Sequence, residues 1–151
     1  METSLHRQLK ALYVADATLH EVVLGDYRID AVRGKELIEV QHGSLAAIRD
    51  KIRRLLDSHR VRVVKPIVAR KTLVKLPAPG AEPTSRRKSP KRGTLLDLFD
   101  ELVYFTRVFP HPRLTLEVVL VEVEELRYPG RGKRRRRRRP EAEFQIEDQR
   151  L

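Results

Sequence analysis

The sequence predicts a mixed α/β protein in which a helix, three strands, a helix and a further strand follow one another. Three observations support this: an apolar stripe near the N-terminus, a strand–turn–strand pattern over residues 27–41, and an amphipathic helical pattern directly after it. Gly34 lies between two runs of strand-forming residues, so residues 27–32 and 36–41 are expected to form a hairpin. We expect a mixed central sheet flanked by helices.

The other elements of residues 1–76 follow from caps and periodicity. Thr3 or Ser4 can cap a helix that ends near Val14, and residues 18–24 form a strand before the hairpin. Ser44 can cap a helix to about residue 58, whose outward face carries Arg49, Lys51, Arg53 and Arg54 and is expected to be solvated. Residues 61–64 and 66–69 predict a further strand or a pair of strands, and residues 72–76 predict another.

The remaining residues predict a linker and a C-terminal appendage. Residues 77–93 are rich in proline, serine and basic side chains and read as a linker or long loop. Thr94 can cap a helix whose apolar stripe comprises Leu95, Leu98, Phe99, Leu102, Phe105 and Val108. Strands are predicted over 114–126 and 143–147, joined by a basic loop at 129–140. Residues 94–151 are therefore expected to form a helix plus β-hairpin appendage to a core at residues 1–76.

The predicted hairpin carries two carboxylates and an amide. Glu39 and Gln41 share a face because strand side chains alternate. A two-residue turn at Arg33-Gly34 puts Asp30 diagonal to Glu39, and a turn at Gly34-Lys35 puts the two directly opposite; a three-residue turn would separate them. We expect a two-residue turn, which places both carboxylates on one face.

Two carboxylates at cross-strand distance repel each other unless something positive lies between them. A divalent cation meets this need, and Mg²⁺ binds one or two protein carboxylates while waters and phosphate oxygens fill its other positions. Mg²⁺, or Mn²⁺ in its place, is therefore the expected cofactor.

Asp30 followed by Glu39-Val40-Gln41 resembles the motif of the PD-(D/E)xK nuclease superfamily, with Gln in place of the usual Lys. The resemblance implies a restriction-endonuclease-like αβββαβ core and metal-dependent hydrolysis of phosphodiester bonds in DNA. It assigns the metal to Asp30, Glu39 and the Val40 carbonyl, and the positioning of the attacking water to Gln41. Resolvase-like members add a Glu from the first helix, and Glu2 is the acid available for that role.

A second interpretation is a nucleic-acid-binding protein that has the same fold but no catalysis. A neutral amide at Gln41 and a heavily basic tail fit this interpretation. Asp30 and Glu39 would then be a hydrogen-bonded surface pair near Arg28. A purely structural domain with a charged tail leaves the converging acids unexplained.

The net charge of +11 is uneven, with +6 in residues 1–76, 0 in 77–127 and +5 in 128–151. Such localised positive charge attracts polyanions, and nucleic acid, with DNA preferred, is the expected partner. An acidic membrane surface is a rival partner, but no hydrophobic anchor accompanies the basic run. The candidate phosphate-contacting residues are Arg86, Arg87, Lys88, Lys133, Arg134, Arg135, Arg136, Arg137, Arg138 and Arg139.

The composition also indicates the cellular compartment in which the protein is expected. The sequence has no cysteine, no apolar run of membrane-spanning length and no apolar segment near Met1. We therefore expect a cytoplasmic protein without a membrane partner, associated with the nucleoid in a prokaryote. Superfamily members that cut duplexes are often dimers, and a homodimer is expected by that analogy.

Overall fold

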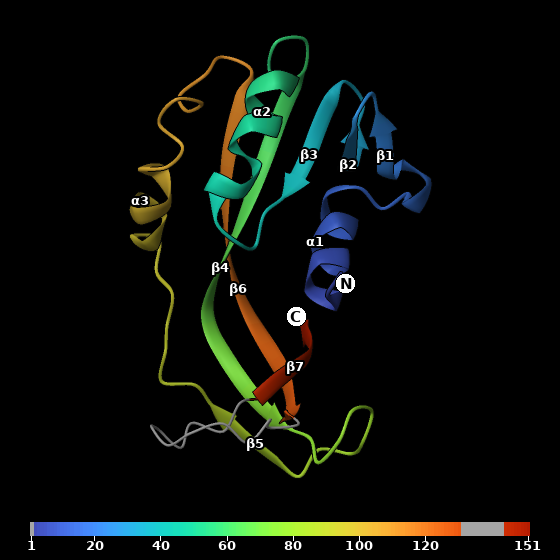
Figure 1. Cartoon of the computed structure of the whole chain (residues 1–151), viewed down its shortest axis with the longest axis vertical. Coiled ribbons are helices and arrows are strands. Elements are labelled where there is room, and N and C mark those ends of the chain that lie inside the picture. The colour runs from blue at the N-terminus through green and yellow to red at the C-terminus, as the bar shows by residue number, and fades with distance from the viewer. Residues whose placement is uncertain (1, 131–143) are drawn as a thin grey trace.

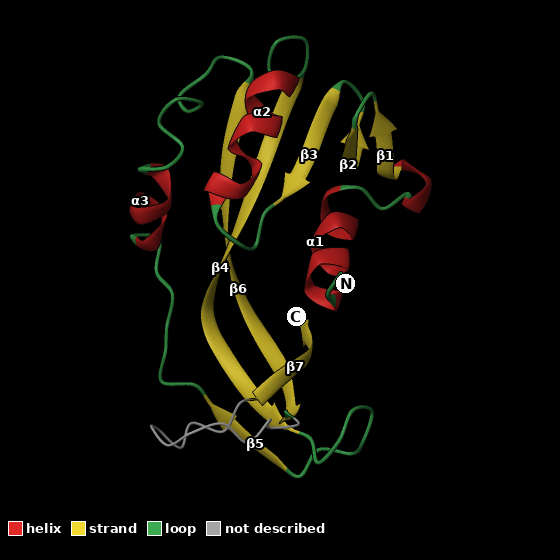
Figure 2. Ribbon diagram, in the orientation of Figure 1, coloured by secondary structure: helices red, strands yellow, loops and turns green. Residues whose placement is uncertain are grey.

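The structure is a computed structural model that describes residues 2–130 and 144–151. These residues form a curled mixed sheet with helices on both faces, as Figures 1 and 2 show. The strands lie in the order β1-β2-β3-β4-β6-β7, and β5 pairs with β4. The elements are α1 (Ser4–Tyr13), β1 (His20–Leu24), β2 (Tyr27–Arg33), β3 (Glu36–Val40), α2 (Arg49–Leu55), β4 (Arg60–Lys75), β5 (Ser85–Lys88), α3 (Asp97–Leu102), β6 (Leu114–Pro129) and β7 (Phe144–Arg150), with short 3₁₀ turns before β1 and α2.

Two long parallel strands, β4 and β6, run side by side through the whole molecule (Figure 1). One half of β4 also pairs with β3 in parallel, and the other half pairs with β5 in antiparallel orientation. The separate strands predicted over residues 61–76 are therefore one strand with an irregularity between Val68 and Arg70. Pro66 lies between the β3 and β5 pairings, where its missing N–H costs no ladder bond on that edge.

The hairpin of β2 and β3 has the register in which its carboxylates lie opposite each other. Arg33 pairs with Glu36, so the turn is Gly34-Lys35, and Gly34 has a φ of +59°. A left-handed conformation of this kind suits glycine because it has no Cβ. The two-residue turn expected from the sequence is confirmed.

Helices on opposite faces of the sheet cover two separate apolar cores. Leu5 and Leu9 of α1 pack with Ile38 and Val121 on one face. The other face buries the side chains of α2 and of the segment after α3, among them Ile52, Leu55, Phe105 and Val108, against Ile29, Leu37 and Val63. In the described part of the chain, no helix is long and apolar enough to cross a membrane.

The C-terminal part differs from the predicted appendage. Strand β6 pairs with β4 along its length and so belongs to the main sheet, and the predicted linker contains β5. The helix expected from Thr94 is regular only over Asp97–Leu102, and Leu95 and Phe99 of its predicted inward stripe are 55% and 64% exposed. The physical reason is that residues such as Phe105 and Val108 already fill the core beneath the segment.

Gly93 should be intolerant of a side chain. Its N–H donates to Val68 O at 2.8 Å, and a Cβ added at residue 93 would lie 2.6 Å from that same oxygen. We expect Gly93→Ala to lower the free energy of unfolding by about 2 kcal/mol, measured by urea denaturation. Gly43→Ala is the control, because its Cβ would meet only the movable Gln41 amide at 3.3 Å; equal losses in both variants would contradict the prediction.

Candidate functional site

The site begins where the ladder between β2 and β3 stops. Backbone pairing of these strands runs from Arg33–Glu36 to Ala31–Ile38. Beyond it, the Asp30 N–H donates to Glu39 Oε1 at 3.3 Å, and the Val40 N–H donates to Asp30 Oδ2 at 2.8 Å. Each carboxylate thus accepts a hydrogen bond from the backbone of the opposite strand, because buried N–H groups require an acceptor. The two predicted acids are brought together.

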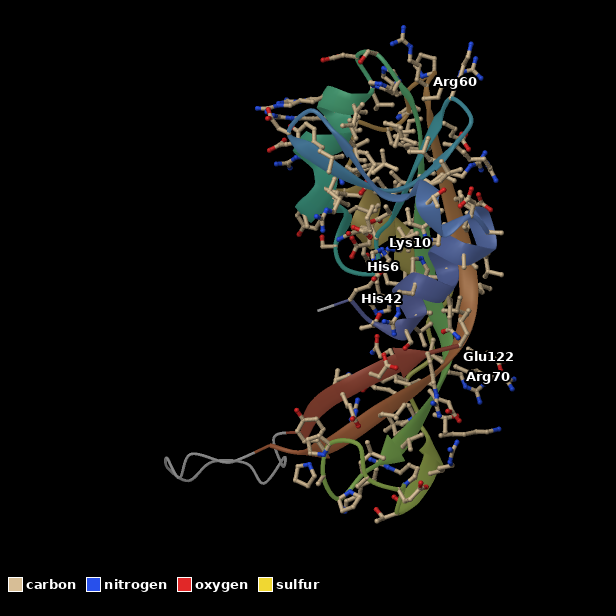
Figure 3. The ribbon with its side chains drawn as sticks, turned by 90° about the vertical axis from the view of Figure 1, so that its right-hand side faces the viewer. His6, Lys10, His42, Arg60, Arg70 and Glu122 are labelled. Carbon is tan, nitrogen blue, oxygen red and sulfur yellow. The ribbon has the colours of Figure 1, made fainter. Side chains whose placement is uncertain are left out.

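Helix α1 provides cationic partners on one side. His6 Nε2 lies 3.1 Å from Asp30 Oδ2, and His6 Nδ1 lies 3.3 Å from Glu2 Oε1. Lys10 is almost fully buried; its Nζ lies 2.6 Å from Glu2 Oε1 and also pairs with Glu21. In Figure 3, His6 and Lys10 lie at mid-height on the molecule. Glu2 therefore reaches the site through His6 and Lys10 rather than by contacting Asp30 directly.

Helix α2 provides a cation to Glu39. Lys51 Nζ lies 2.7 Å from Glu39 Oε1 and donates to Arg28 O at 2.6 Å. Glu39 is only 4% exposed, so this ion pair lies in a poorly solvated place where charge interactions are strong. The cation that contacts Glu39 is thus Lys51 of α2, and it does not come from position 41, where the nuclease motif has its lysine.

Glu21 on β1 adds a third carboxylate beside Asp30, and its backbone is strained. The pairs His20–Ala31 and Val22–Ile29 bracket Glu21, which lies opposite Asp30. Glu21 has a φ of +52°, a conformation that costs about 1 kcal/mol or more for a residue with a side chain. Its carboxylate contacts Lys10, so the backbone distortion accompanies a contact with α1.

The two central carboxyl groups have pKa values displaced in opposite directions. Burial and the neighbouring Asp30 carboxylate raise the pKa of Glu39 to about 7, despite the opposing effect of Lys51. Burial would also raise the pKa of Asp30, but hydrogen bonds from His6 and the Val40 N–H outweigh it and hold the pKa below its usual value. The hydrogen bond to Asp30 raises the pKa of His6. At neutral pH Asp30 is ionised while Glu39 holds a proton part of the time.

The other residues predicted for the site make contacts that differ from the expected ones. Gln41 Nε2 donates to Ser44 O at 2.8 Å, which fixes the loop before α2 rather than extending the carboxylate pair. Arg28, expected beside Asp30, lies 3.8 Å from Glu21 instead. Val40 contacts Asp30 through its N–H.

The predicted phosphate-contacting residues fall in two groups. Arg86, Arg87 and Lys88 form the exposed strand β5, at the far end of β4 from β3, and Arg86 pairs with Glu124. The basic run 133–139 lies outside the described residues.

Sequence reasoning missed four residues of the site, which are His6, Lys10, Glu21 and Lys51. His6 and Lys10 lie four residues apart, which places them on one face of α1, and this spacing was a usable signal. Lys51 was expected on a solvated surface, and only the packing of α2 against the sheet brings it to Glu39. Nothing local in the sequence indicates that contact.

A metal ion at this site would have two carboxylates, Asp30 and Glu39, as its side-chain donors. Asp30 Oδ1 and Glu39 Oε2 form no hydrogen bond with any other residue that the structure describes, so each acid retains one oxygen for a ligand. Among the described residues, no group of three or more His, Cys, Asp or Glu side chains is arranged to hold a metal. Two carboxylates match Mg²⁺, which completes its coordination with waters and phosphate oxygens.

The raised pKa of Glu39 predicts a pH-dependent stability. Its value of about 7 exceeds the usual 4.5, so the folded state binds the proton more tightly than the unfolded state does. Stability should therefore fall as pH rises from about 4.5 through 7. We expect Glu39→Gln to be more stable than the wild type by about 3 kcal/mol at pH 8 and nearly equal to it near pH 4.5.

Urea denaturation in the presence of a chelator measures this difference. The glutamine amide retains an oxygen for the Asp30 N–H and for Lys51, so the variant removes the charge and keeps the contacts. A stability difference that does not change between pH 4.5 and pH 8 would contradict the raised pKa.

Comparison with known proteins assigns a family. No solved structure matches the chain. A protein of Treponema pallidum (strain Nichols) that bears the name "Uncharacterized protein" is 31% identical over 140 residues, which is 92% of this chain and 55% of that protein. The chain thus spans about half the length of that relative. The family described as "Domain of unknown function (DUF8091)" matches residues 3–151, from the cap of α1 to the end of the chain, and the chain belongs to this family.

Proposed function

We propose that the protein is a metal-dependent nuclease that hydrolyses phosphodiester bonds of DNA. One observation carries this proposal: Asp30 and Glu39 meet at the point where β2 and β3 separate, and a lysine contacts Glu39 there at 2.7 Å. Paired carboxylates with an adjacent cation suit phosphodiester hydrolysis, because a metal held by the carboxylates and a positive side chain would share the charge of the phosphate.

The arrangement of elements supports the proposal. Residues 4–75 follow the order α1, β1, β2, β3, α2, β4, and the four strands lie in that same order in the sheet. Strands β1 to β3 are antiparallel, and β4 is parallel to β3 after a helical crossover. This order agrees with the αβββαβ core of the restriction-endonuclease-like fold, and Asp30 and Glu39 lie on the strands where that motif places its acids.

Asp30 Oδ1 and Glu39 Oε2 would hold Mg²⁺ or Mn²⁺, and the Val40 carbonyl is the third proposed ligand. The bound ion would lower the pKa of a water molecule and neutralise charge on the phosphate. His6 contacts only Oδ2 of Asp30, so it orients the carboxylate and leaves the other oxygen accessible. Glu2 in turn contacts His6 and fixes the imidazole.

Lys51 supplies the positive charge that Gln41 lacks. A lysine ammonium has three N–H donors, and Glu39 Oε1 and Arg28 O use two of them. The third is available to an oxygen of the scissile phosphate. The Gln41 amide is hydrogen-bonded to Ser44 O, so its proposed role in positioning water has less support than the role proposed for Lys51.

Exposed cations near the acids suit a polyanionic substrate. Arg28 is 70% exposed two residues before Asp30, and Arg54 of α2 donates to Tyr27 OH at 3.1 Å. Backbone phosphates bind such side chains with release of counterions, so we expect binding to weaken steeply with salt. The basic strand β5, at the far end of β4, would contact phosphates farther along the same DNA molecule.

Three substitutions separate the proposed roles. Asp30→Asn and Lys51→Met should each lower metal-dependent cleavage of duplex DNA at least about a hundredfold, because each removes a group at the reacting phosphate. Gln41→Ala should change the rate by less than about tenfold, since its amide serves the loop. Cleavage is measured with Mg²⁺ and with Mn²⁺, and urea denaturation checks that each variant is folded.

Full activity of Asp30→Asn would refute the assignment of this site. Loss of activity in Gln41→Ala comparable to that in Lys51→Met would contradict the role given to Lys51. Binding of DNA is measured in parallel by fluorescence anisotropy, and it should persist in Asp30→Asn because the cations remain.

A non-catalytic nucleic-acid-binding protein is the second candidate, and one observation favours it. Asp30 and Glu39 already accept backbone N–H groups and pair with His6 and Lys51, so their charges are balanced within the protein. On this view the carboxylates close the end of the hairpin, and the basic surface binds phosphate. Salt-sensitive DNA binding without cleavage by the wild type would select this candidate.

A further inference from the structure

A basic pocket lies at the edge of the sheet where β3, β4 and β6 begin. Its lining residues are Lys35, Ser58, His59, Arg60 and Arg113, and the cavity has a volume of about 410 Å³. None of these lining residues is acidic, so three cationic side chains face the cavity region without an anionic one. A concave site in which cations from several elements meet suits an anionic ligand.

The parallel pairing of three strands brings these cations together. Strands β3 and β6 both pair with β4 in parallel, and all three begin at the top of the molecule in Figure 1. Lys35 directly precedes β3, Arg60 is the first residue of β4, and Arg113 directly precedes β6. Adjacent strands lie about 5 Å apart, so three residues that are distant in the sequence are within reach of a single small anion.

Two of the cations have unused hydrogen-bond donors. The side chains of Lys35 and Arg60 form no hydrogen bond or ion pair with another residue that the structure describes. The neighbouring carboxylate of Glu36 is paired instead with Arg33 and Arg62. Cations gathered at one concave place repel one another, so a bound anion would stabilise this arrangement.

The rest of the lining is held in position by the protein itself. Arg113 Nη1 donates to Leu56 O at 3.2 Å and to Asp57 O at 2.7 Å, which fixes the turn after α2. Ser58 Oγ and His59 Nδ1 lie 3.0 Å apart in that turn. The side chain of Asp57 is not part of the lining. The pocket is therefore formed before a ligand enters, which lowers the entropic cost of binding.

The pocket lies at a defined distance from the carboxylate pair. Lys35 and Glu39 are four residues apart along β3, which corresponds to about 13 Å at the rise of a strand. On the helical turns of α2 and the residues after it, Lys51, Arg54 and Ser58 follow one stripe from Glu39 to the pocket. Phosphates of one DNA strand recur about every 3.4 Å along the duplex axis, so 13 Å corresponds to about four nucleotides.

We infer that this pocket binds a phosphate group, and that in a complex with DNA it holds the backbone about four nucleotides from the phosphate at Asp30 and Glu39. Lys35 and Arg60 donate to the phosphate oxygens, and the hydroxyl of Ser58 is close enough to add a further donor. The affinity for phosphate does not depend on catalysis. Only the spacing from Asp30 and Glu39 rests on the proposed function.

Binding of inorganic phosphate tests the pocket directly. A ¹H–¹⁵N NMR titration of the full chain, freed of nucleic acid, should show saturable shifts of the amides of Lys35, residues 58–60 and Arg113. Arg60→Gln should abolish this saturation. Arg70→Gln is the matched control and should preserve it, because Arg70 is 59% exposed and lies in the lower half of the molecule in Figure 3, far from Arg60.

Binding of duplex DNA, measured by fluorescence anisotropy over a range of salt concentrations, tests the source of the phosphate. Arg60→Gln should raise the dissociation constant at least about fivefold and reduce the slope of log affinity against log salt by about 1, because one phosphate contact is lost. Arg70→Gln should leave the dissociation constant within about twofold of the wild-type value. Urea denaturation checks that both variants are folded.

The outcomes separate this inference from the proposed function. Absence of localised shifts with phosphate, or equal effects of Arg60→Gln and Arg70→Gln, would overturn the pocket. Saturation with phosphate but unchanged DNA affinity in Arg60→Gln would assign the pocket to a free phosphate compound and overturn the contact with DNA. If the wild type binds DNA without cutting it and Arg60→Gln weakens that binding, the nuclease proposal fails and the phosphate pocket stands.

Discussion

The rest of the structure depends on the reciprocal hydrogen bonds between Asp30, Glu39 and the backbone at the end of the β2–β3 ladder. Two carboxylates this close and this poorly solvated are unfavourable unless cations or protons compensate them. The protein compensates in both ways: His6 and Lys51 approach from different helices, and Glu39 has a pKa near 7. The compensation at Glu39 includes a proton as well as Lys51, because its pKa stays raised although the ammonium group lies 2.7 Å away.

This arrangement couples the site to the whole fold. His6 is carried by α1, which packs in one apolar core, and Lys51 is carried by α2, which packs in the other. Each cation reaches its carboxylate only when the core that holds its helix has formed. Packing on the two faces of the sheet thus sets the charge balance at the site, and loss of either helix would leave a buried acid without its partner. The strained Glu21 strengthens the link to α1 through Lys10.

Local patterns predicted the parts of the fold that local rules control. Gly34 predicted the hairpin turn, a two-residue turn placed Asp30 and Glu39 on one face, and the order of helices and strands through β4 followed from periodicity. Contacts between distant residues were not predictable in this way. The insertion of β6 beside β4 and the approach of Lys51 to Glu39 depend on packing across the sheet, and the outward turn of Phe99 depends on which residues fill the core first.

The most direct test of the proposed cation site at Asp30 and Glu39 is a ¹³C NMR titration of the Glu39 side chain, with and without Mg²⁺. We predict a pKa near 7 without metal, because of burial and the neighbouring Asp30 carboxylate, and a clear downward shift of this pKa when Mg²⁺ is added, because the ion favours the ionised form. Assignment is made by comparison with Glu39→Gln. A Glu39 that titrates near 4.5 without metal, or whose pKa is unchanged by millimolar Mg²⁺, would contradict the claim that this site is built to hold a cation.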